Sequence, residues 1–209
     1  PIPRRDVRPR NLPKELSQTE ERRLVVERNV PMDALYMAFH KCDRRHPDYH
    51  TFDLMSDILC NGRSSRLIQH LVQQEQVFSS IDAYISGSID NGLIQIGGKP
   101  APGVSLEEAE AAVWQELEAM KTERIDESEW EKVKNRYESE QIFSNINYLN
   151  VATNLAFFEL IGEAEDINRE VEKYRAITAE RIMEVSKQTF VKENCSVLYY
   201  KSNVIQSET

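Results

Sequence analysis

The 209-residue sequence has only three cysteines, and none is placed for a disulfide framework or a thiolate metal centre. Cys42, Cys60 and Cys195 lie far apart, and no two of them form a Cys-x-x-Cys pair. This spacing argues against a disulfide-stapled fold, a zinc site built on paired thiolates and a redox dithiol. We expect each cysteine to pack as a small hydrophobic residue.

Long apolar runs are also missing from the sequence. No segment approaches the roughly 20 apolar residues that a membrane-spanning helix needs, and no signal peptide is recognisable. The chain opens with Pro1 rather than methionine, as expected of an excised fragment or a mature remnant. The formal net charge of −9 argues against nucleic acid or an anionic membrane as the main partner. We expect a soluble protein, and the sequence leaves both the cytoplasm and the periplasm open.

The sequence contains no recognisable catalytic or metal-binding motif. No H-E-x-x-H or H-x-x-E-H is present, and the pair His46 and His50 encloses Pro47 rather than a glutamate. Ser64 and Ser65 follow a glycine, but they do not form the G-x-S-x-G elbow of a nucleophilic serine. We therefore expect no catalytic residue, no metal ligand and no cofactor in this chain.

The hydrophobic pattern predicts one α+β domain. Four prolines among the charges of residues 1–18 predict an extended linker, residues 19–202 form the domain, and residues 203–209 are a tail. Strands are expected near residues 22–29, 34–42, 81–86, 93–96 and 195–200. Helices are expected near residues 47–60, 67–72, 105–120, 126–144, 155–161 and 178–190, with a further helix beginning near residue 166. Because the strands group in hairpins and the helices are segregated, we expect a mixed, largely antiparallel sheet with helices packed on one face.

Helix-capping patterns mark two of the predicted helix starts. Ser105 with Glu108, and Asp126 with Glu129, have the spacing of a capping box, in which each side chain bonds the other residue's backbone N–H. Both pairs precede amphipathic segments. We therefore expect helices to begin immediately after Ser105 and Asp126.

Two polar breaks interrupt the helical segments. Asn61 and Gly62 end the first helix, and Ser64 is expected to cap the second. Residues 145–154 contain four asparagines, which indicate a break in the long helical region. Its amides could contact a peptide backbone, although a simple kink is the plainer interpretation.

Taken together, the middle of the chain resembles the pitrilysin/insulinase-type zinc metallopeptidases, a family that includes mitochondrial processing peptidase. The resemblance rests on an ordered set of segments between about residue 20 and residue 200: the apolar strand Ala34 to Phe39, His46-Pro-Asp, the stretch Phe52 to Leu59, Asn61-Gly-Arg-Ser-Ser-Arg66-Leu, Tyr84, Asp90-Asn-Gly-Leu93, and the Ser105-Leu-Glu-Glu helix with Glu116-Leu117. The family is built from two similar α+β halves that are joined by a linker and close around a peptide.

The resemblance implies that this chain is the second, catalytically inactive half. In the family, the first half carries H-x-x-E-H plus a downstream glutamate, whereas the second half is catalytically inactive but helps to form the peptide chamber. The expected partners are therefore a zinc-bearing N-terminal half, in the same polypeptide or a separate chain, and a peptide substrate. The sequence also leaves a homodimer open. The alternatives are a catalytically dead assembly subunit of the same fold and a stand-alone peptide-binding module.

The same resemblance points to one candidate substrate-contact segment. In the processing-peptidase branch, a glycine-rich substrate-handling loop occupies the position that is matched here by residues 61–65. The candidate contact residues are Gly62, Arg63, Ser64, Ser65 and Arg66. Arg63 and Arg66 are the side chains in this segment that we would test for peptide contact.

Overall fold

The computed structural model describes residue 13 and residues 15–203, so most of the predicted linker and the tail from residue 204 lie outside the described residues. Within the described residues, five strands form one sheet in the order β1-β5-β2-β4-β3. The strands are β1 (Arg22–Arg28), β2 (Ala34–Lys41), β3 (Phe78–Ile85), β4 (Gly92–Pro100) and β5 (Cys195–Ser202). β1 runs parallel to β5, and every other neighbouring pair is antiparallel. The predicted α+β class and the largely antiparallel sheet are confirmed.

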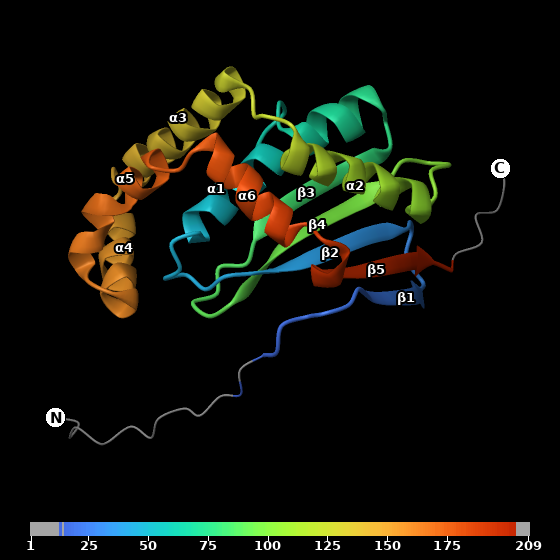
Figure 1. The fold of residues 1–209 in the computed structure, drawn as a ribbon, viewed down its shortest axis with the longest axis horizontal. Helices are drawn as coiled ribbons and strands as arrows, with labels where there is room; N and C mark the ends of the chain where they lie inside the picture. Colours follow the sequence, from blue (N-terminus) through green and yellow to red (C-terminus); the bar gives the residue numbers. More distant parts are fainter. Residues whose placement is uncertain (1–12, 14, 204–209) are drawn as a thin grey trace.

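Helices cover one face of this sheet and leave the other face open. Along β2, Leu35 and Met37 are buried, whereas the alternate residue Tyr36 is 48% exposed. This period-two alternation is expected of a strand with one buried face. Helices α1 (Tyr49–Cys60), α2 (Leu106–Thr122) and α6 (Ala179–Thr189) lie over the buried face (Figure 1). The predicted packing of helices on one face is confirmed.

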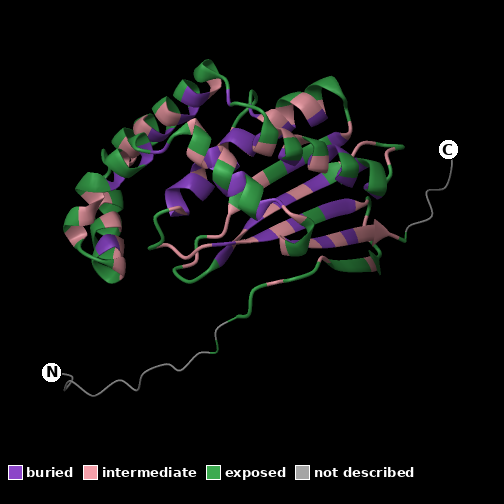
Figure 2. Ribbon diagram, viewed as in Figure 1, coloured by how far each residue is buried: buried purple, intermediate pink, exposed green. Residues whose placement is uncertain are grey.

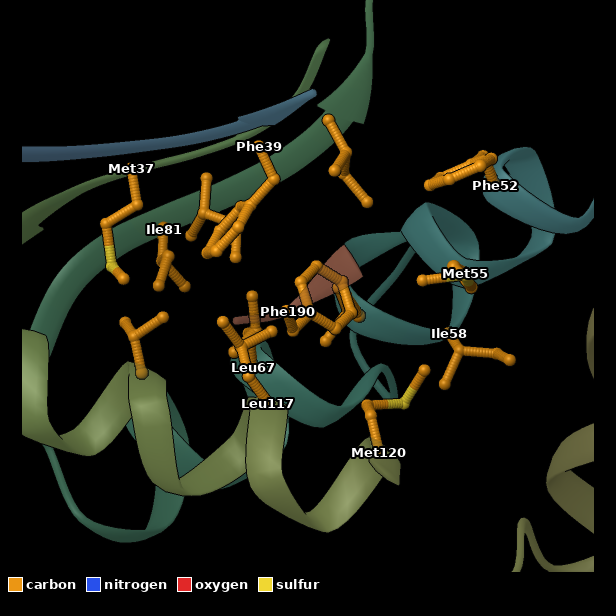
Figure 3. Packing of buried hydrophobic residues seen from close by; sticks show 14 of the residues in the cluster. Met37, Phe39, Phe52, Met55, Ile58, Leu67, Ile81, Leu117, Met120 and Phe190 are labelled. Carbon is orange, nitrogen blue, oxygen red and sulfur yellow. The ribbon is translucent and has the colours of Figure 1, made fainter. Parts of the chain in front are cut away.

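The core fills the space between the sheet and these three helices. Phe39 from β2 packs edge to face against Phe190, the residue that follows α6, at a ring-centroid distance of 5.1 Å. Met55 from α1 and Leu117 from α2 pack into the same cluster (Figure 3). Edge-to-face aromatic pairs add about 1 kcal/mol to the effect of area burial alone. The side chains of the sheet and the helices therefore form one continuous hydrophobic core.

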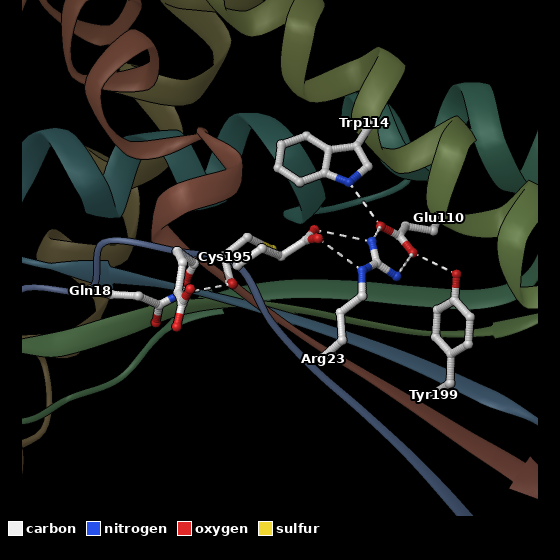
Figure 4. Close-up of polar contacts among 8 residues, drawn as sticks. Gln18, Arg23, Glu110, Trp114, Cys195 and Tyr199 are labelled. Carbon is white, nitrogen blue, oxygen red and sulfur yellow. Dashed lines mark hydrogen bonds and ion pairs between the residues drawn. The ribbon is translucent and has the colours of Figure 1, made fainter.

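A buried carboxylate ties the β1–β5 edge of the sheet to α2. Glu110 accepts hydrogen bonds from both terminal nitrogens of Arg23 on β1, from the Tyr199 hydroxyl on β5 at 2.6 Å and from the Trp114 indole at 3.1 Å (Figure 4). Burial alone raises the pKa of this carboxyl, but the three donors outweigh burial and hold the pKa below its usual range. The network fixes β1, which lies at the edge of the sheet and pairs with β5 alone among the described strands.

Helices α3 (Glu127–Ser144), α4 (Tyr148–Ile161) and α5 (Glu170–Arg175), with the 3-10 helix Ala164–Arg169, form an arm beyond the end of the sheet (Figure 1). The predicted break lies at residues 145–147, where Asn147 caps α4 by accepting a hydrogen bond from the backbone N–H of Leu149 at 2.8 Å. Figure 2 shows that the arm is mostly exposed or half-buried. None of the helices in the described part of the chain is long and apolar enough to cross a membrane.

The capping predictions are confirmed at Ser105 but not at Asp126. Ser105 and Glu108 form the predicted capping box at the start of α2. Asp126 does cap α3, by accepting a hydrogen bond from the backbone N–H of Ser128, but Glu129 does not complete a box. Its carboxylate instead accepts hydrogen bonds from an arginine of another segment, which is described below. The Glu129 carboxylate therefore pairs with this arginine instead of accepting the backbone N–H of Asp126 that would complete the box.

The second helix of the Asn61 region is present, but most of it is a π-helix, Ile68–Gln74. The backbone N–H of Glu75 bonds the carbonyl of His70 at 2.8 Å, five residues earlier. Gln76 follows with a φ of 55°, which is uncommon for a residue other than glycine. The π-helix ends at Gln74, and β3 begins four residues later, at Phe78.

Candidate functional site

The open face of the sheet carries a trough that crosses all five strands. Strand register places its side chains in two transverse rows. The first row is Asp82, Gly97, Tyr36, Leu198 and Leu24, and the second is Tyr84, Gln95, Ala38, Ser196 and Arg22. Together they line a trough of about 380 Å³. Because neighbouring strands lie about 4.8 Å apart, each row extends roughly 19 Å.

Gly97 forms the floor of the trough between two larger side chains. A Cβ atom at this position would lie 3.1 Å from the Asp82 carboxylate and 3.2 Å from the ring of Tyr36. Contacts this short require the neighbours to move, so the absence of a side chain lets Tyr36 lie across the strand. The residue type at Gly97 therefore determines how deep the trough is.

The trough is apolar in its middle and carries charges at its two ends. Tyr36 and Leu198 occupy the centre, whereas Asp82 lies on the edge strand β3 and Arg22 on the opposite edge strand β1. The Tyr84 hydroxyl contacts the Gln95 side-chain oxygen at 3.5 Å, at the long limit for a hydrogen bond. A largely apolar concavity with a few polar groups is the usual character of a small-molecule or peptide site.

The Asn61–Arg66 turn follows α1 and is held in place by α3. Gly62 has a φ of 98°, a conformation that favours glycine. A side chain at this position would meet the guanidinium of Arg136, which donates a hydrogen bond to the Asn61 carbonyl at 2.8 Å. Lys132 donates hydrogen bonds to the carbonyl and hydroxyl oxygens of Ser64, at 3.0 and 2.9 Å. The predicted role of Ser64 as a helix cap is wrong, because its hydroxyl is bound to Lys132 instead.

The five predicted contact residues of this turn have different surroundings. Gly62, Arg63 and Ser64 are exposed, whereas Ser65 is buried and its hydroxyl donates to the Gly62 carbonyl at 2.6 Å. Arg66 donates two hydrogen bonds to the Glu129 carboxylate, from Nε at 3.0 Å and Nη2 at 2.8 Å. Only 11% of the Arg66 side chain is exposed. A peptide can therefore reach Arg63 directly, but it would have to displace Glu129 to reach the Arg66 guanidinium.

The two spaced histidines do not converge on a common point. His46 is exposed, and its Nδ1 accepts the backbone N–H of Asp48 at 3.1 Å. His50 is buried, with Nε2 at 2.9 Å from Glu170 on α5. No group of three or more His, Cys, Asp or Glu side chains that could hold a metal occurs in the described ranges. The residues present therefore do not fit a zinc ion, and the three cysteines are free and at least half-buried.

Glu170 and its partners form a structural ion cluster at the base of the arm. Its carboxylate accepts hydrogen bonds from Arg44 at 2.6 Å and from Lys173 at 3.1 Å, in addition to the contact with His50. Burial opposes ionisation of this carboxyl, but the His50 and Arg44 contacts outweigh burial and lower its pKa to about 2. The Tyr174 hydroxyl donates to Asp53 of α1 beside this cluster. These contacts attach α5 to α1.

The described residues thus form an α+β domain whose sheet is covered by helices on one face and carries an open trough on the other. Residues 2–137 match the family model described as the peptidase M16 inactive domain, and the chain belongs to this family. The resemblance to the inactive half of the zinc metallopeptidases is thereby confirmed. No curated protein sequence matches the chain.

Solved structures with the same fold come from bacteria and from a eukaryote. A protease from Helicobacter pylori aligns with a TM-score of 0.87 and 19% identity over 92% of this chain and 47% of its own. A peptidase M16 inactive domain from Pseudomonas fluorescens aligns with a TM-score of 0.78 and 14% identity, over 90% of this chain and 45% of its own. A chain of complex III2 from Candida albicans, solved with Inz-5 bound, gives a TM-score of 0.71 and 16% identity, over 87% and 46% of the two chains. This chain therefore spans about half the length of these structures.

The trough is not apparent from the linear sequence. The alternation over residues 81–86 indicates which side chains of β3 leave the core, and Tyr84 is part of the family pattern, but the nearly continuous apolar character of residues 34–42 predicts a buried strand and gives no sign that Tyr36 is exposed. The rows themselves depend on how β3, β4, β2, β5 and β1 pair, and those strands come from distant parts of the chain. The register of the five strands is therefore needed to see which side chains line the trough.

Proposed function

We propose that this domain is the non-catalytic C-terminal half of a zinc-dependent endopeptidase and that its trough holds an extended peptide against a zinc-bearing N-terminal half. The trough across all five strands is the observation that carries the proposal. Membership of the peptidase M16 inactive domain family supports it. The partner half lies in the same polypeptide or in a separate chain, and zinc is bound there.

The chemistry of the trough suits a peptide better than a small polar metabolite. Tyr36 and Leu198 offer an apolar centre for one substrate side chain, and the Gln95 amide and Tyr84 hydroxyl offer hydrogen bonds to a peptide backbone. The zinc-bearing half would supply the activated water. Closure of the two halves would exclude bulk solvent, and a peptide held in a reactive geometry would be cleaved faster than a free one.

The Asn61–Arg66 turn remains a second candidate contact. Gly62, Arg63 and Ser64 present an exposed surface that α3 holds in one conformation. Arg63 is the side chain of this group that a carboxylate or a backbone carbonyl of a substrate can reach. Arg66 supports the turn through its ion pair with Glu129.

Peptide cleavage by this chain assembled with its zinc-bearing half tests the proposal. Truncating Tyr36 to alanine should raise KM about tenfold with little change in kcat, because the side chain would bind ground state and transition state equally. Met32→Ala is the matched control, because Met32 is 45% exposed but lies outside the trough. Arg63→Ala, compared with the exposed Arg45→Ala, tests the turn in the same assay. Unchanged kinetics in Tyr36→Ala would refute the role of the trough.

The chain alone should neither cleave peptides nor bind stoichiometric zinc. Metal analysis after zinc addition and chelation, together with a peptide-hydrolysis assay, checks both statements. Hydrolysis that is lost on chelation and returns with zinc would contradict the assignment of this chain as the inactive half.

A catalytically dead assembly subunit is the second candidate function, and the likeness to a chain of complex III2 favours it. It predicts that the partner half also lacks H-x-x-E-H, whereas the peptidase proposal requires that motif. A stand-alone peptide-binding module, the third reading, predicts peptide binding with no partner half at all. Sequencing the parent gene on both sides of the domain, and the genes of proteins that co-purify with it, separates the three.

A further inference from the structure

One end of the trough carries an exposed carboxylate that has no cationic partner in the described part of the chain. Asp82 lies on the edge strand β3 and lines the trough. Its side chain forms no hydrogen bond and no ion pair with any described residue. Lys99 lies in the next transverse row, opposite Ser80, and does not pair with it either. The Asp82 carboxylate can therefore bind a cation that another molecule brings.

The Asp82 carboxylate lies beside an aromatic ring, above the glycine that forms the floor of the trough. A Cβ atom at Gly97 would lie 3.1 Å from Oδ1 of Asp82 and 3.2 Å from the ring of Tyr36, so both groups border the same small space. Tyr84 follows Asp82 by two residues and therefore lies on the same face of β3. Both tyrosines are 48% exposed. One long side chain that enters this space can touch the carboxylate and an aromatic ring together.

A basic side chain suits this combination of groups. The guanidinium of arginine and the ammonium of lysine both form charge-assisted hydrogen bonds with a carboxylate, and both are attracted to the face of a tyrosine ring. The aliphatic stem of either side chain can pack on aromatic surface while its charge stays near water. An apolar side chain would instead bury the carboxylate without giving it a partner, which costs free energy. An acidic side chain would be repelled.

The opposite end of the trough disfavours a basic side chain. Arg22 lies on β1, the other edge strand, and is exposed. It lies four strand spacings from Asp82, or roughly 19 Å across the sheet. This separation exceeds the screening length of about 8 Å at physiological salt, so each charge acts mainly on the part of a peptide next to it. The two charges therefore give a bound peptide a direction, with its basic residue at the β3 end.

We propose that the β3 end of the trough is a subsite for an arginine or lysine side chain of the bound peptide, selected by Asp82. The inference rests on the proposed function and names the substrate class: peptides with a basic residue at one fixed position. The basic side chain contacts Asp82 and Tyr36 above Gly97, and the peptide continues across Leu198 towards β1. Asp82 determines which peptide is held and takes no part in the chemistry of cleavage.

Cleavage of matched peptides by the chain assembled with its zinc-bearing half tests the subsite. A single arginine is moved one position at a time along an otherwise uncharged peptide. Each peptide is paired with one that carries citrulline, the neutral isostere of arginine, at the same position. The wild-type assembly should prefer arginine about fivefold in kcat/KM at one position, the size expected of an exposed ion pair. The preference should shrink as salt is added.

Three variants identify the group that gives the preference. Asp82→Asn should abolish it, and the fold should persist because the exposed carboxylate makes no hydrogen bond within the described residues. Asp82→Lys should instead favour glutamate over glutamine at the same peptide position, because the charge is reversed. Asp90→Asn is the matched control and should keep the arginine preference, since Asp90 is exposed between β3 and β4 but lies outside the trough.

The subsite would be overturned if no position showed an arginine preference, or if the preference survived in Asp82→Asn. It would also be overturned if the zinc-bearing half itself occupied this end of the trough. Asp82→Asn would then weaken assembly of the two halves and leave the choice between arginine and citrulline unchanged.

Failure of the proposed function gives a different pattern of results. Tyr36→Ala would then leave the cleavage of every peptide unchanged, whereas failure of the subsite alone leaves the Tyr36 effect intact. If the assembly cleaves no peptide, fluorescence anisotropy of the same labelled peptides gives the ratio of the Kd values for citrulline and arginine. A ratio of about five that falls to one in Asp82→Asn supports the subsite, and a ratio of one in the wild type refutes it.

Discussion

Replacing Glu170 with glutamine should destabilise the domain by about 3 kcal/mol at neutral pH. Glu170 is 5% exposed and its carboxylate accepts hydrogen bonds from Arg44, His50 and Lys173. The pKa of this carboxyl falls from an ordinary 4.5 to about 2 in the folded state. Each unit of pKa difference between the folded and unfolded states is equivalent to about 1.4 kcal/mol, so the carboxylate stabilises the fold by roughly 3 kcal/mol. Breaking a buried ion pair by removing one partner costs about 3–5 kcal/mol, which agrees.

The stabilisation by Glu170 should depend on pH with a defined sign. Because its pKa is lower in the folded state, the carboxylate stabilises the fold fully above pH 4.5, the value for the unfolded chain. The contribution should decline as the pH falls from 4.5 towards 2, where the folded state also takes up the proton. Urea unfolding of the wild-type chain and Glu170→Gln between pH 7 and pH 2.5 measures this difference directly.

Glu172→Gln is the matched control, since Glu172 lies on the same short helix but is exposed. It should change the free energy of unfolding by less than about 0.5 kcal/mol at any pH. If Glu170→Gln were no more destabilising than this control, the ion cluster would not anchor the arm. A large loss that stayed constant down to pH 2.5 would show that the glutamine acts through packing, and the reasoning from the lowered pKa would be wrong.

Two further substitutions test the geometry of the fold and of the turn. Gly98→Ala should lower the free energy of unfolding, measured with urea, by about 1–3 kcal/mol, because the new Cβ would lie 2.6 Å from the ring of Phe78. Gly87→Ala is the neutral control, because no atom lies within 4 Å of a Cβ at that position. Arg66→Ala should cost about 2 kcal/mol, because it leaves the Glu129 carboxylate without its guanidinium partner. Equal stability of Gly98→Ala and Gly87→Ala, or a fully stable Arg66→Ala, would contradict the corresponding contact.

The strands and most helix ends could be predicted because they depend on residues close together in the sequence. The alternation of apolar and polar residues over 81–86 indicated a strand with two different faces, and Ser105 with Glu108 indicated a helix start. In both cases the decisive interactions join a residue to the strand or helix that contains it. Local rules therefore suffice for them.

The ion pairs could not be predicted in the same way, because their partners are distant in sequence. Glu129 was assigned to a local capping box, but Arg66, 63 residues earlier, competes for its carboxylate. His50 and Glu170 are separated by 120 residues, and no spacing rule relates them. The chain is rich in carboxylates, so the sequence alone does not tell which one each cation will select.

The chemistry of the trough suits the peptide that we propose for it. An apolar centre combines with the Gln95 amide and with charged ends, Asp82 and Arg22, which suits a chain that brings its own polar backbone. Both rows of side chains depend on the pairing of all five strands, so the proposed peptide site is a property of the whole sheet rather than of one segment of the sequence.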